Sequence, residues 1–193
     1  VYRLLERNDD IRLPQVADIY ERGLSLNVMS KAYGLPGLRI GWIATKDREL
    51  LSQMERAKHY LSICNSGPSE ILSLIALRAR NQILTRNRAL IENNIELVNE
   101  FFNEYDNLFD WTIPDGGCIG YPYYRGADGV EAFCLALVKK SGVLLLPASV
   151  YTSALNDTPA DHFRIGYGRT NMAEGLAAMR EYIEQSDAMC ATR

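Results

Sequence analysis

The stretch of this sequence with the most chemical potential is residues 30–42, SKAYGLPGLRIGW. Lys31 stands at the end of one apolar run, and Arg39 precedes another that begins at Ile40. The Gly and Pro residues between them are typical of a tight loop joining two strands. Glycine allows unusual backbone angles and Pro36 fixes one φ, so we expect a rigid loop that presents both cations. An amine can form a Schiff base and a guanidinium can bind a phosphate through two hydrogen bonds, which suits an anionic carbonyl ligand.

This stretch resembles the pyridoxal-phosphate attachment site of the class I/II aminotransferases. The resemblance rests on Ser30 and Lys31, the GLPG turn at residues 34–37, and Arg39 eight residues after the lysine. It implies that the cofactor is pyridoxal 5'-phosphate, that Lys31 is the catalytic residue and holds it as a Schiff base, and that Ser30 and Arg39 help to bind it. Val28 departs from the family, which commonly has a hydroxyl residue there for the phosphate. The alternative for any single lysine or arginine is a solvated surface charge.

Two further site residues follow from the resemblance. Tyr2 stands where the family has a tyrosine that hydrogen-bonds the hydroxyl on the cofactor ring, although without the resemblance it is a packed strand tyrosine. Arg164 lies in the apolar segment 162–168, where a guanidinium is costly unless it meets an anion. The family carries its substrate-carboxylate arginine in such a strand, and a carboxylate matches a guanidinium through two hydrogen bonds. An internal salt bridge or a solvent-facing arginine remains the alternative for Arg164.

The composition, with 193 residues of which 47% are hydrophobic and 23% charged, is that of an ordinary soluble globular protein. A net charge of -3 argues against binding to nucleic acid or to an anionic membrane, because both need a basic face. No apolar run is long enough to cross a membrane, and the first residues have no signal-peptide layout. Two histidines, His59 and His162, predict no metal site. The cysteines are widely spaced and favour reduced thiols in the cytoplasm: Cys64, Cys118, Cys134 and Cys190.

Strand and helix signals alternate along the chain and predict an α/β fold. Strands are expected at 24–28 and 40–44 on either side of the lysine loop, and Asp47 is expected to cap a helix that ends near Tyr60. Residues 68–105 contain no interior Gly or Pro and predict one bent helix or two helices end to end. Later strands are expected at 108–113, 118–124, 142–147 and 162–168, and later helices at about 128–140 and 171–186.

Taken with the resemblance, this layout implies the C-terminal part of a fold type I pyridoxal-phosphate-dependent transferase. Residues 1–66 would be the remainder of the cofactor-binding large domain. Residues 67–105 would be a connecting helix or helix pair, and residues 106–193 a small α+β C-terminal domain. The chain begins at Val1 rather than Met and lacks the family's other cofactor contacts, so we expect a fragment that is inactive alone.

The activity implied by the resemblance is amino-group transfer between an amino acid and a 2-oxo acid, in amino acid metabolism and biosynthesis. Family members share active sites between two subunits, so a homodimer is expected. Two alternatives stay open: the same scaffold supports decarboxylase, lyase or cyclase reactions, and a chain without the first half of the fold could be a non-catalytic interaction module. Product analysis would separate the enzymatic alternatives, because transamination releases an oxo acid whereas the other reactions release carbon dioxide or an alkene.

Overall fold

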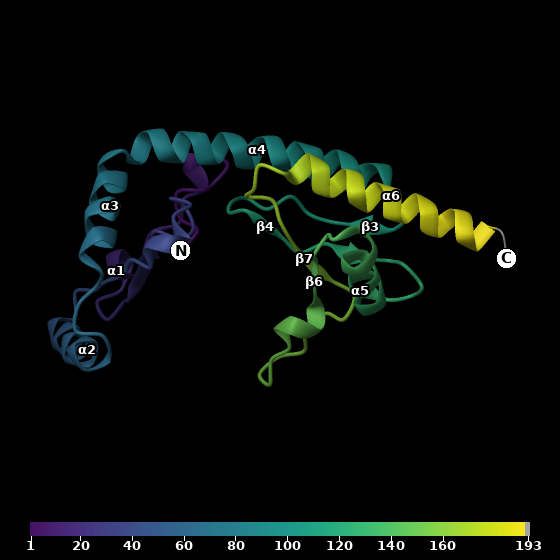
Figure 1. Cartoon of the computed structure of the whole chain (residues 1–193). Helices are drawn as coiled ribbons and strands as arrows, with labels where there is room; N and C mark the ends of the chain where they lie inside the picture. The colour runs from purple at the N-terminus through teal and green to yellow at the C-terminus, as the bar shows by residue number, and fades with distance from the viewer. Residues whose placement is uncertain (192–193) are drawn as a thin grey trace. The chain divides into compact units, whose positions relative to one another are not determined.

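The computed structural model describes the backbone of residues 1–191 and the side chains of residues 1–186, so the expectation for Cys190 lies outside the described side chains. The chain divides into two compact units (Figure 1). Unit 1 comprises Val1–Arg88 with Asp115–Gly117, and unit 2 comprises Ala89–Pro114 and the residues from Cys118 onward. The boundary falls inside helix α4 (Arg80–Glu104).

Unit 1 contains a two-stranded antiparallel sheet in which β1 (Ser25–Val28) pairs with β2 (Gly41–Ala44). Val28 lies opposite Gly41, so the two strands enter and leave the lysine loop side by side. The remaining elements of the unit are the 3₁₀ turns η1 (Asp9–Ile11) and η2 (Pro36–Leu38) and the helices α1 (Val16–Ile19), α2 (Arg48–Leu61) and α3 (Gly67–Arg78).

The helices of unit 1 begin and end where local chemistry dictates. The Asp47 carboxylate accepts a hydrogen bond from the backbone N–H of Leu50 at 2.9 Å, which satisfies one of the unpaired donors at the start of α2 and confirms the predicted cap. The long helical run consists of two helices, α3 and α4. They are separated at Ala79, whose N–H closes α3 on the carbonyl of Ile75 at 3.0 Å.

Unit 2 contains a three-stranded antiparallel sheet in the order β4 (Ile119–Gly120), β7 (Phe163–Gly166), β6 (Leu146–Pro147). A separate ladder pairs β3 (Phe109–Asp110) with β5 (Tyr123–Tyr124). Helix α5 (Val130–Ser141) packs against β6 and against α6 (Met172–Ala191), and the turn η3 (Ala148–Tyr151) follows β6. Helix α6 lies along the C-terminal part of α4 (Figure 1), where Arg180 pairs with Glu104. Among residues 1–191, no helix is both long enough and apolar enough to cross a bilayer.

The core of unit 2 is aromatic. Phe109 and Phe163 are 2% and 0% exposed, and their ring centroids lie 5.9 Å apart in an edge-to-face arrangement. Tyr124 stacks on Phe133 with centroids 4.3 Å apart. Such ring pairs add roughly 0.5–1.5 kcal/mol each beyond the burial of their surface, and the pair of Phe109 with Phe163 ties β7 to this core.

Several predicted strands are shorter in the structure. The expected strand 118–124 is divided into β4 and β5 because Pro122 has no N–H to donate to a ladder. The strand expected at 108–113 is reduced to β3, since its partner β5 has only two residues. The strand expected at 142–147 is reduced to β6, because Gly142 ends α5 with φ 74° and the residues after it form a connection. At the N-terminus, residues 1–5 form a turn without a strand, with the Leu5 N–H bonded to the Tyr2 carbonyl at 3.1 Å.

Candidate functional site

Lys31 lies in the loop between β1 and β2, and this loop is closed by its own hydrogen bonds. The N–H of Met29 donates to the carbonyl of Ile40 at 3.0 Å, and the N–H of Leu35 donates to the carbonyl of Met29 at 2.9 Å. Met29, 0% exposed, and Ala32, 3% exposed, are buried, whereas the Lys31 side chain is exposed. The loop is therefore anchored through its apolar neighbours and presents the amine to solvent.

Helix α4 adds a second anchor for this loop. The side-chain amide of Asn87 donates through Nδ2 to the carbonyl of Ala32 at 2.8 Å. A Cβ on Gly34 would lie 3.4 Å from that same Nδ2, and Gly34 has φ 66°, a conformation in which other residues are strained. Asn87 thus fixes the backbone directly after the lysine.

Arg39 lies at the other end of the loop, directly after η2. It has φ 55°, in the left-handed region, which costs a non-glycine residue about 1–2 kcal/mol. Its guanidinium is exposed and donates from Nη1 to the carbonyl of Pro36 at 3.1 Å. Strained backbone is characteristic of functional positions, and here it holds a second cation on the loop that carries Lys31.

Tyr2 reaches Lys31 from the N-terminal segment of unit 1. The Lys31 Nζ lies 5.6 Å from the centroid of the Tyr2 ring, within cation–π range. The ring also lies against Gly117, since a Cβ there would be 3.5 Å from a Tyr2 ring carbon. The phenol of Tyr2 and the amine of Lys31 therefore belong to one site.

Four charged residues hold the segment that carries Tyr2. Arg12 Nε donates to the Glu6 carboxylate at 3.1 Å, and Arg88 of α4 donates to Asp9 at 2.8 Å and to the carbonyl of Leu4 at 2.9 Å. Burial raises the pKa of Glu6, but hydrogen bonds from the backbone N–H groups of Glu6 and Leu4 and from Arg12 outweigh it, so the pKa is lowered. A hydrogen bond from Arg88 likewise lowers the pKa of Asp9. Both carboxyl groups are thus stabilised in their charged form.

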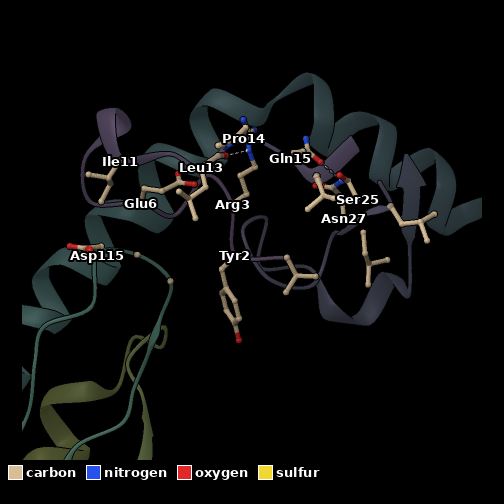
Figure 2. A pocket seen from close by; sticks show the side chains of 16 residues that line it. Tyr2, Arg3, Glu6, Ile11, Leu13, Pro14, Gln15, Ser25, Asn27 and Asp115 are labelled. Carbon is tan, nitrogen blue, oxygen red and sulfur yellow. Dashed lines mark hydrogen bonds between the residues drawn. The ribbon is translucent and has the colours of Figure 1, made fainter. Parts of the chain in front are cut away.

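A pocket of about 660 Å³ opens beside this segment (Figure 2). Tyr2, which adjoins the lysine loop, lines this pocket, whereas Lys31 is not among its lining residues. Its walls are mainly apolar, with Leu13 and Leu26 among them, and Asn27 of β1 donates across it to Gln15 at 3.1 Å. The pocket therefore lies next to the lysine site and does not coincide with it.

Arg164 is the one predicted site residue in unit 2, on the central strand β7. Its Nη1 donates to the hydroxyl of Tyr151, the last residue of η3, at 3.1 Å. The end of β7 is fastened by Asn94 of α4, 2% exposed, which donates through Nδ2 to the carbonyls of Tyr167 at 2.8 Å and Arg169 at 2.7 Å. These bonds satisfy an amide that would be costly to bury alone.

The predicted residues thus fall into two groups. Ser30, Lys31 and Arg39 share one loop, and Tyr2 adjoins it, all within unit 1. Arg164 belongs to unit 2. Sequence reasoning missed Asn87 and Tyr151, because their partners are 55 and 13 residues away and no local pattern marks them.

A family model described as "Aminotransferase class I and II" matches residues 6–181. Capreomycidine synthase of Streptomyces vinaceus is 30% identical over 176 residues, which cover 90% of this chain and 43% of that protein. Aspartate/prephenate aminotransferase of Cereibacter sphaeroides is 31% identical over 186 residues, with the same 90% and 43% coverage. The chain therefore spans less than half the length of these curated relatives.

Solved structures give a similar result. A pyridoxal-phosphate-dependent aminotransferase from Streptococcus suis matches with a TM-score of 0.83 and 26% identity, over 96% of this chain and 47% of that one. The pyridoxal-phosphate-dependent cyclase OrfR matches with a TM-score of 0.72 and 25% identity, over 84% of this chain and 43% of that one.

Proposed function

The chain belongs to the class I and II aminotransferase family, and from that premise we propose that it is part of a pyridoxal-phosphate-dependent aminotransferase acting on an amino acid and a 2-oxo acid. The observation that carries the proposal is the site around Lys31. An exposed amine stands on a hydrogen-bonded loop, with a phenol ring 5.6 Å from it and a guanidinium on the same loop.

The side chains present at this site fit pyridoxal phosphate. The cofactor has an aldehyde, a phosphate and a ring hydroxyl, and the loop offers a primary amine, the Arg39 guanidinium and the Ser30 hydroxyl. The Tyr2 phenol completes the set, since a hydroxyl can both donate and accept a hydrogen bond. We assign Lys31, Ser30, Arg39 and Tyr2 to cofactor binding on the chemistry of these groups.

Pyridoxal phosphate, when bound, supplies an aldehyde for the substrate's amino group and a ring that withdraws electrons from the substrate's α-carbon. Lys31 would have two tasks: its amine would attach the cofactor, and the same amine, once displaced by the substrate's amino group, would move the proton from the substrate's α-carbon to the cofactor carbon that carried the aldehyde. Arg39 holds the phosphate through its fork of N–H donors, and the anchored loop keeps the lysine in position.

Arg164 is proposed to bind the substrate carboxylate, because a guanidinium on a strand can offer a carboxylate two parallel hydrogen bonds. We further propose that residues 1–66 belong to the cofactor-binding domain, that residues 67–105 connect it to the rest, and that residues 106–193 are a small α+β domain. A cytoplasmic homodimer with shared active sites completes the proposal, and its support is the family.

A second candidate is a different reaction on the same cofactor. It is favoured by the similarity to capreomycidine synthase and to the cyclase OrfR. Both candidates use Lys31 in the same way and differ in which substrate bond is broken. Product analysis separates them, because transamination yields a 2-oxo acid whereas cyclisation yields a ring-containing amino acid.

The proposal is tested by fixing the cofactor in place. Purified chain is mixed with pyridoxal phosphate, reduced with borohydride and digested, and the modified lysine is located by mass spectrometry. Lys31→Ala is compared with Lys46→Ala, which removes an exposed lysine at the end of the neighbouring strand. Modification concentrated on Lys31 and lost only in Lys31→Ala supports the proposal, while equal modification of Lys31 and Lys46 contradicts it.

A further inference from the structure

Helix α3 of unit 1 carries small residues on its buried side and large apolar residues on its exposed side. Its two buried residues are Ser73 and Ala76. Four of its large apolar side chains are between 44% and 59% exposed: Ile71, Leu72, Leu74 and Ile75. A surface helix ordinarily has the opposite arrangement, with its apolar face on the core and polar residues outside. The inverted arrangement of α3 indicates that its outer face is covered by another surface.

The four exposed side chains form one continuous face. Successive residues of an α-helix are turned by about 100°, so these four fall within about half of the circumference of α3, and Ser73 and Ala76 fall in the other half. Single apolar side chains on a surface are common and need no explanation. Four large ones on one face of a 12-residue helix form a patch of the kind that binds another protein surface.

Two opposite charges lie at the ends of this face. Glu70 is exposed in the first turn of α3, and Arg78 is exposed in its last turn. Each is four residues from Leu74, so the three residues form a row along one edge of the apolar face. Asn65 donates through Nδ2 to the Glu70 carboxylate at 3.0 Å, which holds the negative charge at the start of the helix. The row therefore runs from a negative charge, through a leucine, to a positive charge.

A row with this order is complementary to itself when two copies of the helix run antiparallel. Homodimers are mostly two-fold symmetric, so that each contact between unlike residues is made twice. With the two-fold axis at Leu74, Glu70 of each copy would lie opposite the partner's Arg78, and Ile71 and Ile75 would pack between the helices. The antiparallel arrangement also brings together the oppositely charged ends of the two helix dipoles.

We propose that the outer face of α3 is a homodimer interface, occupied by α3 of a second copy of this chain. The inference rests on one part of the proposed function, the homodimer, and names the surface that joins the two subunits. The order of Glu70, Leu74 and Arg78 favours a second copy as the occupant, because only another α3 matches that order by symmetry.

The charges are tested by sedimentation equilibrium of the whole chain, which measures the dissociation constant of its dimer. Glu70→Arg opposes two arginines at each pair, and Arg78→Glu opposes two glutamates. Each substitution acts twice in a symmetric dimer, so we expect each to raise the dissociation constant by roughly tenfold. Circular dichroism checks that both variants keep the fold.

An equimolar mixture of these two variants is the decisive measurement. In a mixed dimer, Glu70→Arg and Arg78→Glu restore opposite charges at both pairs, although each variant alone has like charges there. We expect the mixture to form mixed dimers about as tightly as the wild-type chain forms its own, detected with a fluorescent label on one variant. A mixture that dimerises no better than either variant alone would overturn the antiparallel pairing.

The apolar part of the interface is tested by Ile75→Asp. This substitution acts at two places in a symmetric dimer, so we expect it to raise the dissociation constant by roughly a hundredfold. Leu155→Asp is the matched control, since it changes an exposed leucine of unit 2 and should leave dimerisation unaltered.

The outcomes separate this inference from the function on which it rests. A dimer that persists unchanged in every α3 variant would overturn the α3 interface and leave the homodimer standing. A wild-type chain that is monomeric at every concentration measured would overturn both, and the outer face of α3 would then be covered by something other than a second copy. Borohydride labelling of Lys31 does not involve α3, so its result decides the proposed cofactor separately.

Discussion

The Lys31 ammonium lies over the Tyr2 ring, with Nζ 5.6 Å from the ring centroid. The two residues come from different parts of unit 1, the β1–β2 loop and the N-terminal turn. A cation–π contact at such a site contributes about 0.5–1 kcal/mol. The same ring contacts the turn at Gly117, so the phenol has a defined place beside the amine.

The hydroxyl of Tyr2 can be tested apart from its ring. Tyr2→Phe keeps the ring face that contacts Lys31 and removes the hydroxyl. We expect its affinity for pyridoxal phosphate to fall by roughly tenfold, the effect of losing one hydrogen bond to a charged group, and its free energy of unfolding to stay unchanged. Tyr2→Ala loses both contributions and should bind more weakly still. Absorbance titration measures each affinity, and equal affinity of Tyr2→Phe and the wild-type chain would remove Tyr2 from the cofactor site.

Asn87 should control the mobility of the lysine loop. Asn87→Ala leaves the Ala32 carbonyl without the amide that donates to it at 2.8 Å. Losing one such bond costs about 1 kcal/mol, so we expect amide hydrogen exchange in residues 32–35 to become roughly fivefold faster. Asn81→Ala, at an exposed position in the first turn of the same helix, is the control. Unchanged exchange in Asn87→Ala would mean that the loop is fixed by its own hydrogen bonds.

Unit 1 should lose stability in acid through Glu6 and Asp9. The pKa of each carboxyl is lowered in the folded chain, from ordinary values of 4.5 and 3.8. The stability that they contribute is therefore fully present above those values and is lost as pH falls through the lowered ones. Urea unfolding across this range checks the prediction. Glu6→Gln should flatten the pH dependence, whereas Glu21→Gln, which changes an exposed carboxylate of the same unit, should leave it intact.

Asn94 should be among the most sensitive positions of unit 2. Its Nδ2 serves the carbonyls of Tyr167 and Arg169 at 2.8 and 2.7 Å, and the side chain is 2% exposed. Asn94→Ala leaves both carbonyls without this donor and should lower the free energy of unfolding by about 2–4 kcal/mol, since each lost partner costs about 1–3 kcal/mol. Asn93→Ala, its exposed neighbour on α4, should change it by less than about 0.5 kcal/mol. Equal effects in the two variants would show that the buried amide is not needed.

Local chemistry made much of this structure predictable. Asp47 stands where a capping carboxylate is needed, and the GLPG turn at residues 34–37 supplies the backbone freedom that the lysine loop uses, with φ 66° at Gly34. The spacing of apolar residues predicts helices at α2 and α4, because the periodicity of a helix face can be recognised from a few neighbouring residues. The position of Lys31 and Arg39 on one loop follows from the same local signals.

What could not be predicted depends on residues distant in sequence. Asn87 donates to the carbonyl of Ala32, 55 residues away, and no local sequence pattern at either residue predicts this hydrogen bond. The apolar and aromatic residues around Pro122 predict one continuous strand, yet the missing N–H of Pro122 divides that strand in two. Tyr151 has an ordinary turn sequence around it, so its bond to Arg164 follows only from the register of β6 on β7.

The chain carries two tryptophans, and the division into units places one in each. Trp42, on β2, is 39% exposed, whereas the Trp111 ring lies 5.4 Å from that of Phe102 inside the aromatic cluster of unit 2. Their fluorescence therefore reports different events: Trp111 emission follows the melting of the aromatic interior, and Trp42 emission follows the strand pair that carries the lysine loop. If either tryptophan is replaced by phenylalanine, the fluorescence of the remaining one reports the unfolding of a single unit, with no attached dye.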